Sequence, residues 1–331
     1  MKDNKKHKKA EYGILITGLI ILLAATCVIA LCAGQYSVSV PEVIKILASR
    51  FVNVTKTWSN TAEGVVFTLR LPRMIGAVLV GSALSLSGAA YQGVFKNPLV
   101  APDLLGVSSG ACVGASVAIL LHLNSFGVQA MAFVAGILAV GLTLFIPRLI
   151  KNTNMTMLVL SGIIVKGIMD SVMGIIKYVA DPETELQSIT YWQLGSLTKV
   201  LPRDLFTVGP VIIAASVIIF LLRWRINILS LGDREAKTLG VSVTVVRNFI
   251  IICATLLTAS AVCISGTIGW IGLVIPHFAR MLTGPDNTKA IPASILIGAI
   301  FMVAIDTLAR ALTSVELPLS ILTGIIGAPF L

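Results

Sequence analysis

Long apolar runs recur from one end of the chain to the other, with short polar or charged segments between them. Most runs are near 20 residues, the length that an α-helix needs to cross a bilayer, and the alternating pattern of barrel strands does not occur. The pattern predicts an all-α membrane bundle of about ten transmembrane helices. The eighth and tenth runs are short for a full crossing, so we expect one or both to be tilted or re-entrant. The expected helices are roughly 12–33, 71–94, 104–123, 126–147, 155–178, 206–224, 245–264, 271–283, 290–309 and 317–331.

The composition supports a multi-pass membrane protein. Of the 331 residues, 56% are hydrophobic and 12% are charged, which is about half the charged fraction of a soluble domain. No shift in composition marks a boundary, so residues 1–331 are predicted to form a single transmembrane domain. A basic N-terminal tail, about residues 1–11, precedes an apolar run longer than the hydrophobic region of a signal peptide. This predicts an uncleaved first helix.

The net charge of +10 is better explained by membrane topology than by nucleic-acid binding. Lys and Arg collect at alternate ends of the predicted helices, as the positive-inside rule requires. We therefore expect a cytoplasmic N-terminus, and an even number of helices places the C-terminus there too. The cytoplasmic basic residues would be Lys2, Lys5, Lys6, Lys8, Lys9, Lys96, Arg148, Lys151, Arg223, Arg225, Arg234, Lys237, Arg247 and Lys289. Arg70, Arg73, Lys199, Arg203 and Arg310 fall on the outer side and break the rule.

Small residues recur at every fourth position in two of the predicted helices. Positions 77, 81, 85, 89 and 93 are Ala, Gly, Ser, Ala and Gly, and the spacing returns in Gly106, Gly110, Gly114 and Ala118. Because lipid offers little hydrophobic drive between helices, such stripes hold helices together through close backbone approach. The stripes predict a compact bundle.

Two ionisable residues, Lys166 and Asp170, lie four positions apart inside the fifth predicted helix. Charged groups at membrane depth are costly, so they usually pair or face an aqueous cavity. We expect these two to form a structural ion pair or to line a translocation path. A secondary transporter coupled to ions through Asp170 or Asp306 is the alternative function that such residues leave open.

Signals for catalysis by this chain are weak. Residues 106–110 match the G-x-S-x-G motif of serine hydrolases, but they open a membrane helix and lack the strand that the motif requires. A hydrolase based on Ser108 is therefore the least favoured function. No P-loop occurs, and the five cysteines lie in apolar runs without metal-binding spacing. We expect no catalytic residue, metal or cofactor on this chain.

A short charged segment, about residues 229–243, lies between two apolar runs. Ser230 followed by Asp233 favours a capped helix start, and Gly240 is suited to end the helix. We expect a short helix over 231–239 outside the bilayer. In it Arg234, Glu235 and Lys237 would be exposed, and Leu231, Ala236 and Leu239 would pack against the protein.

Five ordered blocks resemble the FecCD-type permease subunits of ABC importers for iron complexes and vitamin B12. They are residues 69–111, 191–197 ("YWQLGSL"), 231–241 ("LGDREAKTLGV"), 266–282 and 306–330. The resemblance implies the fold of the B12 permease (BtuC-like, type II), with ten helices in each subunit. It also implies two permease subunits, identical or homologous, two separate ATPase subunits that bind ATP and Mg²⁺, and an extracytoplasmic substrate-binding protein. The substrate would be an iron(III)-siderophore or similar metal chelate, with haem or cobalamin as further options, carried across the cytoplasmic membrane.

The resemblance also assigns roles to residues. The block at 231–241 matches the region that couples the permease to the ATPase, here Leu231, Gly232, Asp233, Arg234, Glu235, Ala236, Leu239 and Gly240. Arg70, Arg73 and Arg310 match arginines that bind acidic residues of the binding protein, which would explain their position on the outer side. The fifth and tenth helices and the segment containing Trp192 would border the path. Family members usually carry small or neutral polar residues at the positions of Lys166 and Asp170.

Overall fold

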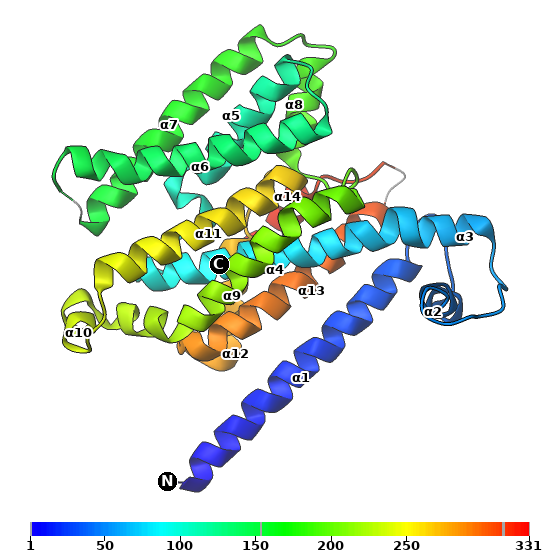
Figure 1. Ribbon diagram of the computed structural model, residues 1–331, viewed down its shortest axis with the longest axis horizontal. Helices are drawn as coiled ribbons and strands as arrows, with labels where there is room; N and C mark the ends of the chain where they lie inside the picture. The colour runs from blue at the N-terminus through cyan, green and yellow to red at the C-terminus, as the bar shows by residue number, and fades with distance from the viewer. Residues whose placement is uncertain (1, 153, 313–314, 331) are drawn as a thin grey trace.

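The computed structural model describes residues 2–152, 154–312 and 315–330, and the side chains of the predicted basic tail at positions 1–9 lie outside this description. Within these ranges the chain forms helices and connecting segments, without a β-strand (Figure 1). The helices are α1 (Lys2–Cys32), α2 (Val40–Ala48), α3 (Asn60–Gly64), α4 (Leu71–Phe95), α5 (Val107–Leu120), α6 (Ser125–Leu149), α7 (Met155–Val179), α8 (Glu185–Leu194), α9 (Pro202–Leu231), α10 (Asp233–Thr238), α11 (Val243–Ser265), α12 (Ile271–Thr283), α13 (Asn287–Ala311) and α14 (Leu319–Gly327).

Ten of these helices coincide with the ten predicted apolar runs, so the predicted fold class is confirmed. Seven are long and apolar enough to cross a membrane: α1, α4, α6, α7, α9, α11 and α13. The shorter three are α5, α12 and α14. The prediction of a full third crossing over 104–123 is wrong, because Pro102–Leu105 forms a 3₁₀ turn and Gly106 is left-handed, with φ +78°. α5 has only 14 residues, a length of about 21 Å.

α4 is the central helix of the bundle. It contacts α9, α11, α12 and α13, while α5, α6, α7 and α8 form a second group that joins the first through α11 (Figure 1). α1 runs beside α13 at the edge. The bundle has two ends, which we call the α10 end and the α2 end after the short helices found there (Figure 1).

Small residues let α4 approach its neighbours closely, as the stripes predict. A Cβ added to Gly81 would overlap the backbone of Gly298 in α13, and one added to Gly88 would overlap the carbonyl of Gly272 in α12. In the second stripe, Gly110 and Gly114 face the backbone of α6. The predicted close packing of helices is confirmed.

Several elements have no counterpart among the predicted helices. α2, α3 and α8 are short and lie outside the long apolar runs, and residues Val65–Arg70 continue α3 into α4 as a π-helical turn. These elements lie at the α2 end, where they connect the long helices (Figure 1).

We predict that Gly88→Ala separates α4 from α12 and lowers the stability of the folded protein. Overpacking of this kind costs about 1–3 kcal/mol. Gly141→Ala is the matched control, because Gly141 lies inside α6 with no atom within 4 Å of its Cβ position, and alanine favours a helix there. Thermal unfolding in detergent measures both. Equal or higher stability of Gly88→Ala would contradict the close contact.

Candidate functional site

The charged segment at 229–243 forms the junction between α9 and α11 at the α10 end. α9 continues unbroken through Leu231. Ser230 therefore lies inside α9, and its hydroxyl donates to the carbonyl of Asn227 at 2.6 Å. The prediction that Ser230 caps the short helix is wrong. The chain turns instead at Gly232, which has φ +145° and ψ +156°, a conformation that is essentially restricted to glycine.

α10 ends as the sequence predicts. Gly240 has φ +76°, and its N–H donates to the carbonyl of Lys237 at 3.0 Å. The N–H of Val241 donates to the carbonyl of Ala236 at 3.0 Å. These two bonds form a Schellman motif, which fixes the direction in which the chain leaves the helix. The short helix is thus held rigidly between α9 and α11.

The exposed surface of α10 and its two ends is both charged and apolar. Ala236 is fully buried, as predicted, but Leu231 and Leu239 are 65% and 58% exposed. The prediction that these two leucines pack internally is wrong: Leu231 ends α9 and Leu239 follows α10, so both lie at the ends of the short helix, where no neighbouring helix covers them. Arg234, Glu235 and Lys237 are exposed, as predicted.

Asp233 fixes α10 to two long helices. Its carboxylate accepts hydrogen bonds from Arg247 of α11, at 2.8 and 2.9 Å, and from Lys96 at the end of α4, at 3.0 Å. The hydrogen bond from Arg247 holds the pKa of the Asp233 carboxyl below its usual value, and Lys96 adds to this effect. The carboxylate therefore stays ionised, and the pairing is lost only when the pH falls through this lowered pKa.

A cavity of about 380 Å³ lies where α5, α12 and α14 begin inside the bundle. Two carboxylates, Asp103 and Asp170, line it together with hydroxyl groups and the indole of Trp270. The Asp103 carboxylate also accepts the N–H of Ser108 at 2.9 Å and so fixes the first turn of α5. The described lining residues include Ser109, Thr258, Thr267 and Ser320 but no histidine.

Lys166 and Asp170 do not pair with each other. The Lys166 amine lies 3.0 Å from the carboxylate of Asp103, and both side chains of the predicted pair are exposed on α7. Of the two, Asp170 lines the 380 Å³ cavity. Their role in a translocation path stays a prediction.

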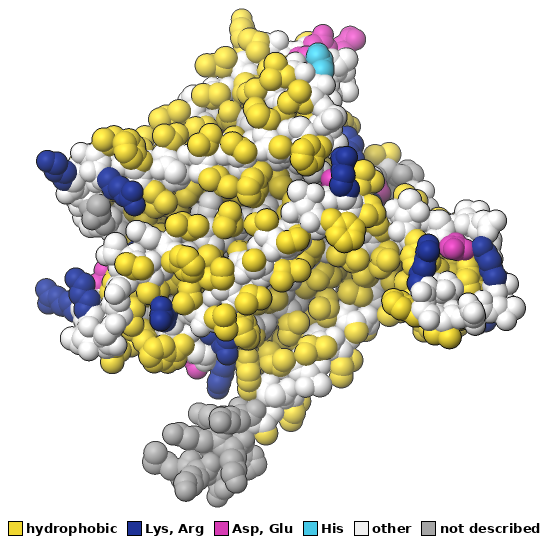
Figure 2. Space-filling model, in the orientation of Figure 1, with side chains coloured by type: hydrophobic (Ala, Val, Ile, Leu, Met, Phe, Trp, Pro, Cys, Tyr) yellow, Lys and Arg dark blue, Asp and Glu magenta, His cyan; other side chains and the backbone are white. Residues whose placement is uncertain are grey.

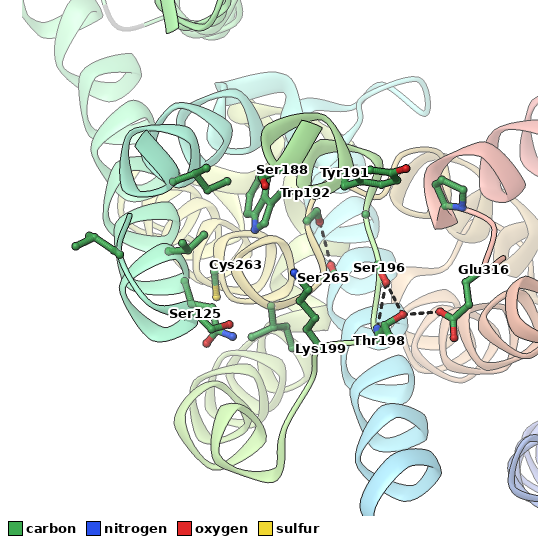
Figure 3. Close-up of a pocket in the computed structure, with 18 of the residues that line it drawn as sticks. Ser125, Ser188, Tyr191, Trp192, Ser196, Thr198, Lys199, Cys263, Ser265 and Glu316 are labelled. Carbon is green, nitrogen blue, oxygen red and sulfur yellow. Dashed lines mark hydrogen bonds between the residues drawn. The ribbon is translucent and has the colours of Figure 1, made fainter. Parts of the chain in front are cut away.

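A larger cavity, about 1170 Å³, opens toward the α2 end. Trp192 and Ser188 of α8 line it on one side and Ser125 of α6 on another, with Lys199 extending into it (Figure 3). Figure 3 also shows Ser196, Thr198 and Glu316 joined by hydrogen bonds at its edge. The prediction that Trp192 borders a path remains untested, although the residue lines this cavity.

A layer of backbone at helix ends lies between the two cavities. It consists of residues 193–197, 265–270 and 318–320, where α8 and α11 end and α12 and α14 begin, and most of these residues line one cavity or the other. Their backbones bond to each other: the N–H of Ser196 donates to the carbonyl of Ser265 at 2.8 Å, and the N–H of Leu319 donates to that of Gly195 at 3.1 Å. We call these three segments the septum.

Arg70 and Arg310 complete the end of α1. Arg70 is 6% exposed and donates to the carbonyls of Leu31 and Cys32, at 2.7 and 3.1 Å, and to that of Tyr36. Arg310 donates to the carbonyls of Ala33, at 3.0 Å, and Ala30. The last carbonyls of a helix have no partner within it, so these guanidinium groups satisfy them.

Arg73 is 8% exposed and bridges two carboxylates. It lies 2.9 Å from Asp306 of α13 and 2.7 Å from Glu316 in the link before α14. The sequence resemblance gives Arg70, Arg73 and Arg310 a docking role, and that role stays a prediction. The structure shows an internal role, because all three side chains are engaged by groups of the same chain.

The family model of the FecCD transport family matches residues 21–331. The chain belongs to the FecCD transport family. It is 38% identical to the molybdate import system permease protein MolB of Haemophilus influenzae, over 96% of this chain and 94% of that protein. It is also 40% identical to a protein named probable iron chelatin transport system permease of Helicobacter pylori, over 80% of each chain. A solved ABC transporter, described as of metal-chelate type and inward-facing, superimposes with a TM-score of 0.86 at 36% identity, covering 96% of this chain and 97% of that one.

This FecCD protein is therefore a permease of an ABC importer, with the BtuC-like fold that the sequence predicts. Membership of that class argues against the alternative hypothesis of an ion-coupled secondary transporter. Asp306, one of the two carboxylates proposed for ion coupling, is bound by Arg73.

Sequence reasoning missed the partners of the charged residues. Asp103, Lys96 and Glu316 each bind a side chain more than 60 positions away. One signal was present: Asp103 is an acidic residue at the start of the third apolar run, where a charge inside the membrane needs a partner.

We predict that Arg73→Gln destabilises the folded permease, because it leaves the buried Asp306 carboxylate without its partner. Removing one member of a buried ion pair costs about 3–5 kcal/mol. Lys199→Gln is the control, a change of the same kind at an exposed cation of the same end. Thermal unfolding in detergent compares them. A fully stable Arg73→Gln variant that has lost uptake would instead favour docking by this arginine.

Proposed function

We propose that this permease moves an iron(III) chelate, with an iron(III)-siderophore as the leading candidate, across the cytoplasmic membrane. It works with two ATPase subunits, a second permease subunit and an extracytoplasmic binding protein. The observation that carries the proposal is the α9–α10–α11 junction, a rigid charged helix fixed between two long apolar helices. In this proposal the α10 end faces the cytoplasm, and the chain itself binds no metal or nucleotide.

The exposed surface of α10 and its two ends suits a contact with the ATPase. Leu231 and Leu239 offer apolar surface, and Arg234, Glu235 and Lys237 surround it with charge. Apolar anchors within a charged rim are typical of specific protein interfaces. ATP and Mg²⁺ would be bound by that partner.

Movement of α10 would reach three long helices directly. α10 is joined to α9 through Gly232, and Asp233 binds α11 and the end of α4. α4 leads through residues 97–101 to Asp103, which lines the 380 Å³ cavity. A movement of α10 would thus reach the cavity through the ion pairs of Asp233 and then through residues 97–101.

The two cavities and the septum would form part of the translocation path. Substrate sites of transporters often lie where helices are interrupted, and irregular backbone at membrane depth is tolerated where it lines a cavity. Lys166 and Asp170 are exposed on α7, which is costly against lipid. A second permease subunit covering this face would enclose the path and remove that cost.

The substrate class rests on the relatives. One is named for an iron chelatin and another for molybdate, and the molybdate relative covers more of this chain. Molybdate is a second candidate for this reason. Uptake of radioactive iron(III)-siderophore and of radioactive molybdate, measured in cells lacking and regaining this permease, tests the choice. Restored molybdate uptake without iron uptake would exclude the iron chelate.

We predict that Asp233→Asn lowers uptake several-fold while the ATPase subunits stay bound and hydrolyse ATP, because α10 loses its ionic attachment to α4 and α11. The same change at Asp181, whose carboxylate is bound only within its own loop, is the control. Proteoliposomes containing the complete transporter report ATP hydrolysis and uptake together. An unchanged ratio of uptake to hydrolysis would exclude a coupling role for Asp233.

We also predict that a cysteine at position 170 reacts with a water-soluble thiol reagent, because Asp170 lines the proposed path. Ile168→Cys is the control, since it lies on the opposite side of α7. Labelling above the background of the native cysteines is measured by mass spectrometry on the intact transporter. Unreactive Asp170→Cys, or equal labelling at both positions, would remove Asp170 from the path.

A further inference from the structure

The segment between α1 and α3 exposes an apolar surface that transport does not explain. Val40, Ile44, Phe51 and Val52 are 47%, 56%, 91% and 64% exposed. In soluble proteins an exposed apolar cluster of this kind marks a contact with a protein or a membrane.

These side chains follow a helical spacing. Positions 40, 44 and 51 place Val, Ile and Phe on one exposed stripe of α2 and its continuation, and Leu47 on the same side is half-buried against the cluster that contains Val43 and Ile46. Val43 and Ile46 lie on a different face and are buried against the protein. Lys45 is exposed on the remaining side. α2 thus presents three faces: one to the protein, one apolar and one polar.

α2 lies at the level where α1 reaches the edge of the bilayer. The apolar part of α1, Ala10–Cys32, is 23 residues long, enough to span the hydrocarbon core of about 30 Å. Leu31, in its last turn, shares a buried cluster with Val43, Ile46 and Trp58. Figure 1 shows α2 end-on while the long helices run across the view, so α2 crosses their direction. A helix in this place lies along the membrane surface.

The segment is held in place at several points. The Arg50 guanidinium lies 4.6 Å from the centre of the Phe67 ring, and the Lys56 amine lies 2.7 Å from the Glu63 carboxylate. Arg70 binds the carbonyl of Tyr36 from inside the bundle. The apolar stripe is therefore a fixed surface. At the right of Figure 2, where α2 and α3 lie in Figure 1, hydrophobic surface and Lys or Arg side chains are next to each other.

We propose that residues 40–52 form an interfacial anchor, inserted into the boundary between lipid headgroups and acyl chains at the α2 end. The exposed side chains of the stripe, Val40, Ile44 and Phe51, enter the acyl region, and Lys45 stays among the headgroups, as in amphipathic helices that lie on membranes. The anchor depends on the membrane-spanning fold alone. In the orientation given under Proposed function it occupies the outer leaflet, and it does not depend on coupling to the ATPase.

The test places a fluorescent reporter on the stripe. Phe51→Trp is reconstituted in nanodiscs made with lipids brominated near the top of the acyl chain, and its added indole emission is compared with that of the parent. Thr55→Trp is the matched control, at an exposed loop position outside the stripe. We expect brominated lipid to quench most of the added emission at position 51 and aqueous iodide to quench it little, with the reverse at position 55.

Iodide quenching without lipid quenching at position 51 would overturn the proposal, as would equal lipid quenching at both positions. The binding protein is the other occupant to distinguish. Protection of position 51 from iodide that begins only after this soluble partner is added would make the stripe a protein-docking surface and overturn the lipid anchor. If Phe51→Trp does not fold, Ile44→Trp reports on the same stripe. Uptake and ATP hydrolysis by the Phe51→Trp variant are measured separately. The quenching result requires neither activity, so failure of the anchor and failure of the proposed function can be distinguished.

Discussion

Every backbone polar group at membrane depth must find its partner within the protein, and this constraint shapes the whole chain. Continuous helices satisfy it internally, but each end and interruption needs other donors and acceptors. At the end of α1, the guanidinium groups of Arg70 and Arg310 bind the last carbonyls. In the septum, helix ends and the segments between them bind one another through backbone bonds such as that from Ser196 to Ser265. The proposed functional features lie where the helices end or are interrupted.

The same constraint gives a physical cause to the arginines that are predicted on the outer side. A basic residue on the outer side of a membrane suggests a docking surface when only its charge is considered. Burial gives Arg70 and Arg73 an internal role beside the predicted one, because both are nearly inaccessible and bound by backbone carbonyls or carboxylates. A helix C-terminus attracts cations whatever side of the membrane it is on. The docking role of these arginines stays a prediction beside this internal one.

Sequence patterns predicted the features that depend on local periodicity. Apolar runs located ten helices, small-residue stripes located the close contacts of α4, and Gly240 located the end of α10. They did not predict pairings between distant residues, such as Lys166 with Asp103 in place of Asp170. Local spacing favoured the wrong partner there because it says nothing about which helices become neighbours. The prediction that Ser230 caps the short helix failed for a related reason. Its local sequence fits a cap, but α9 continues through it.

The position of Asp233 links these observations into one mechanical argument. A short helix that merely connected two spans would move freely about glycines such as Gly232. Its movement would then not be transmitted to the long helices. The carboxylate removes that freedom by holding Lys96 and Arg247 at once. Lys96 is the residue at which α4 ends, and the chain that follows it leads to Asp103 at the cavity. The bond between Asp233 and Lys96 therefore connects α10 to the cavity through only a few residues. In the proposed importer, force from the ATPase would therefore arrive at α4, the helix against which most others pack.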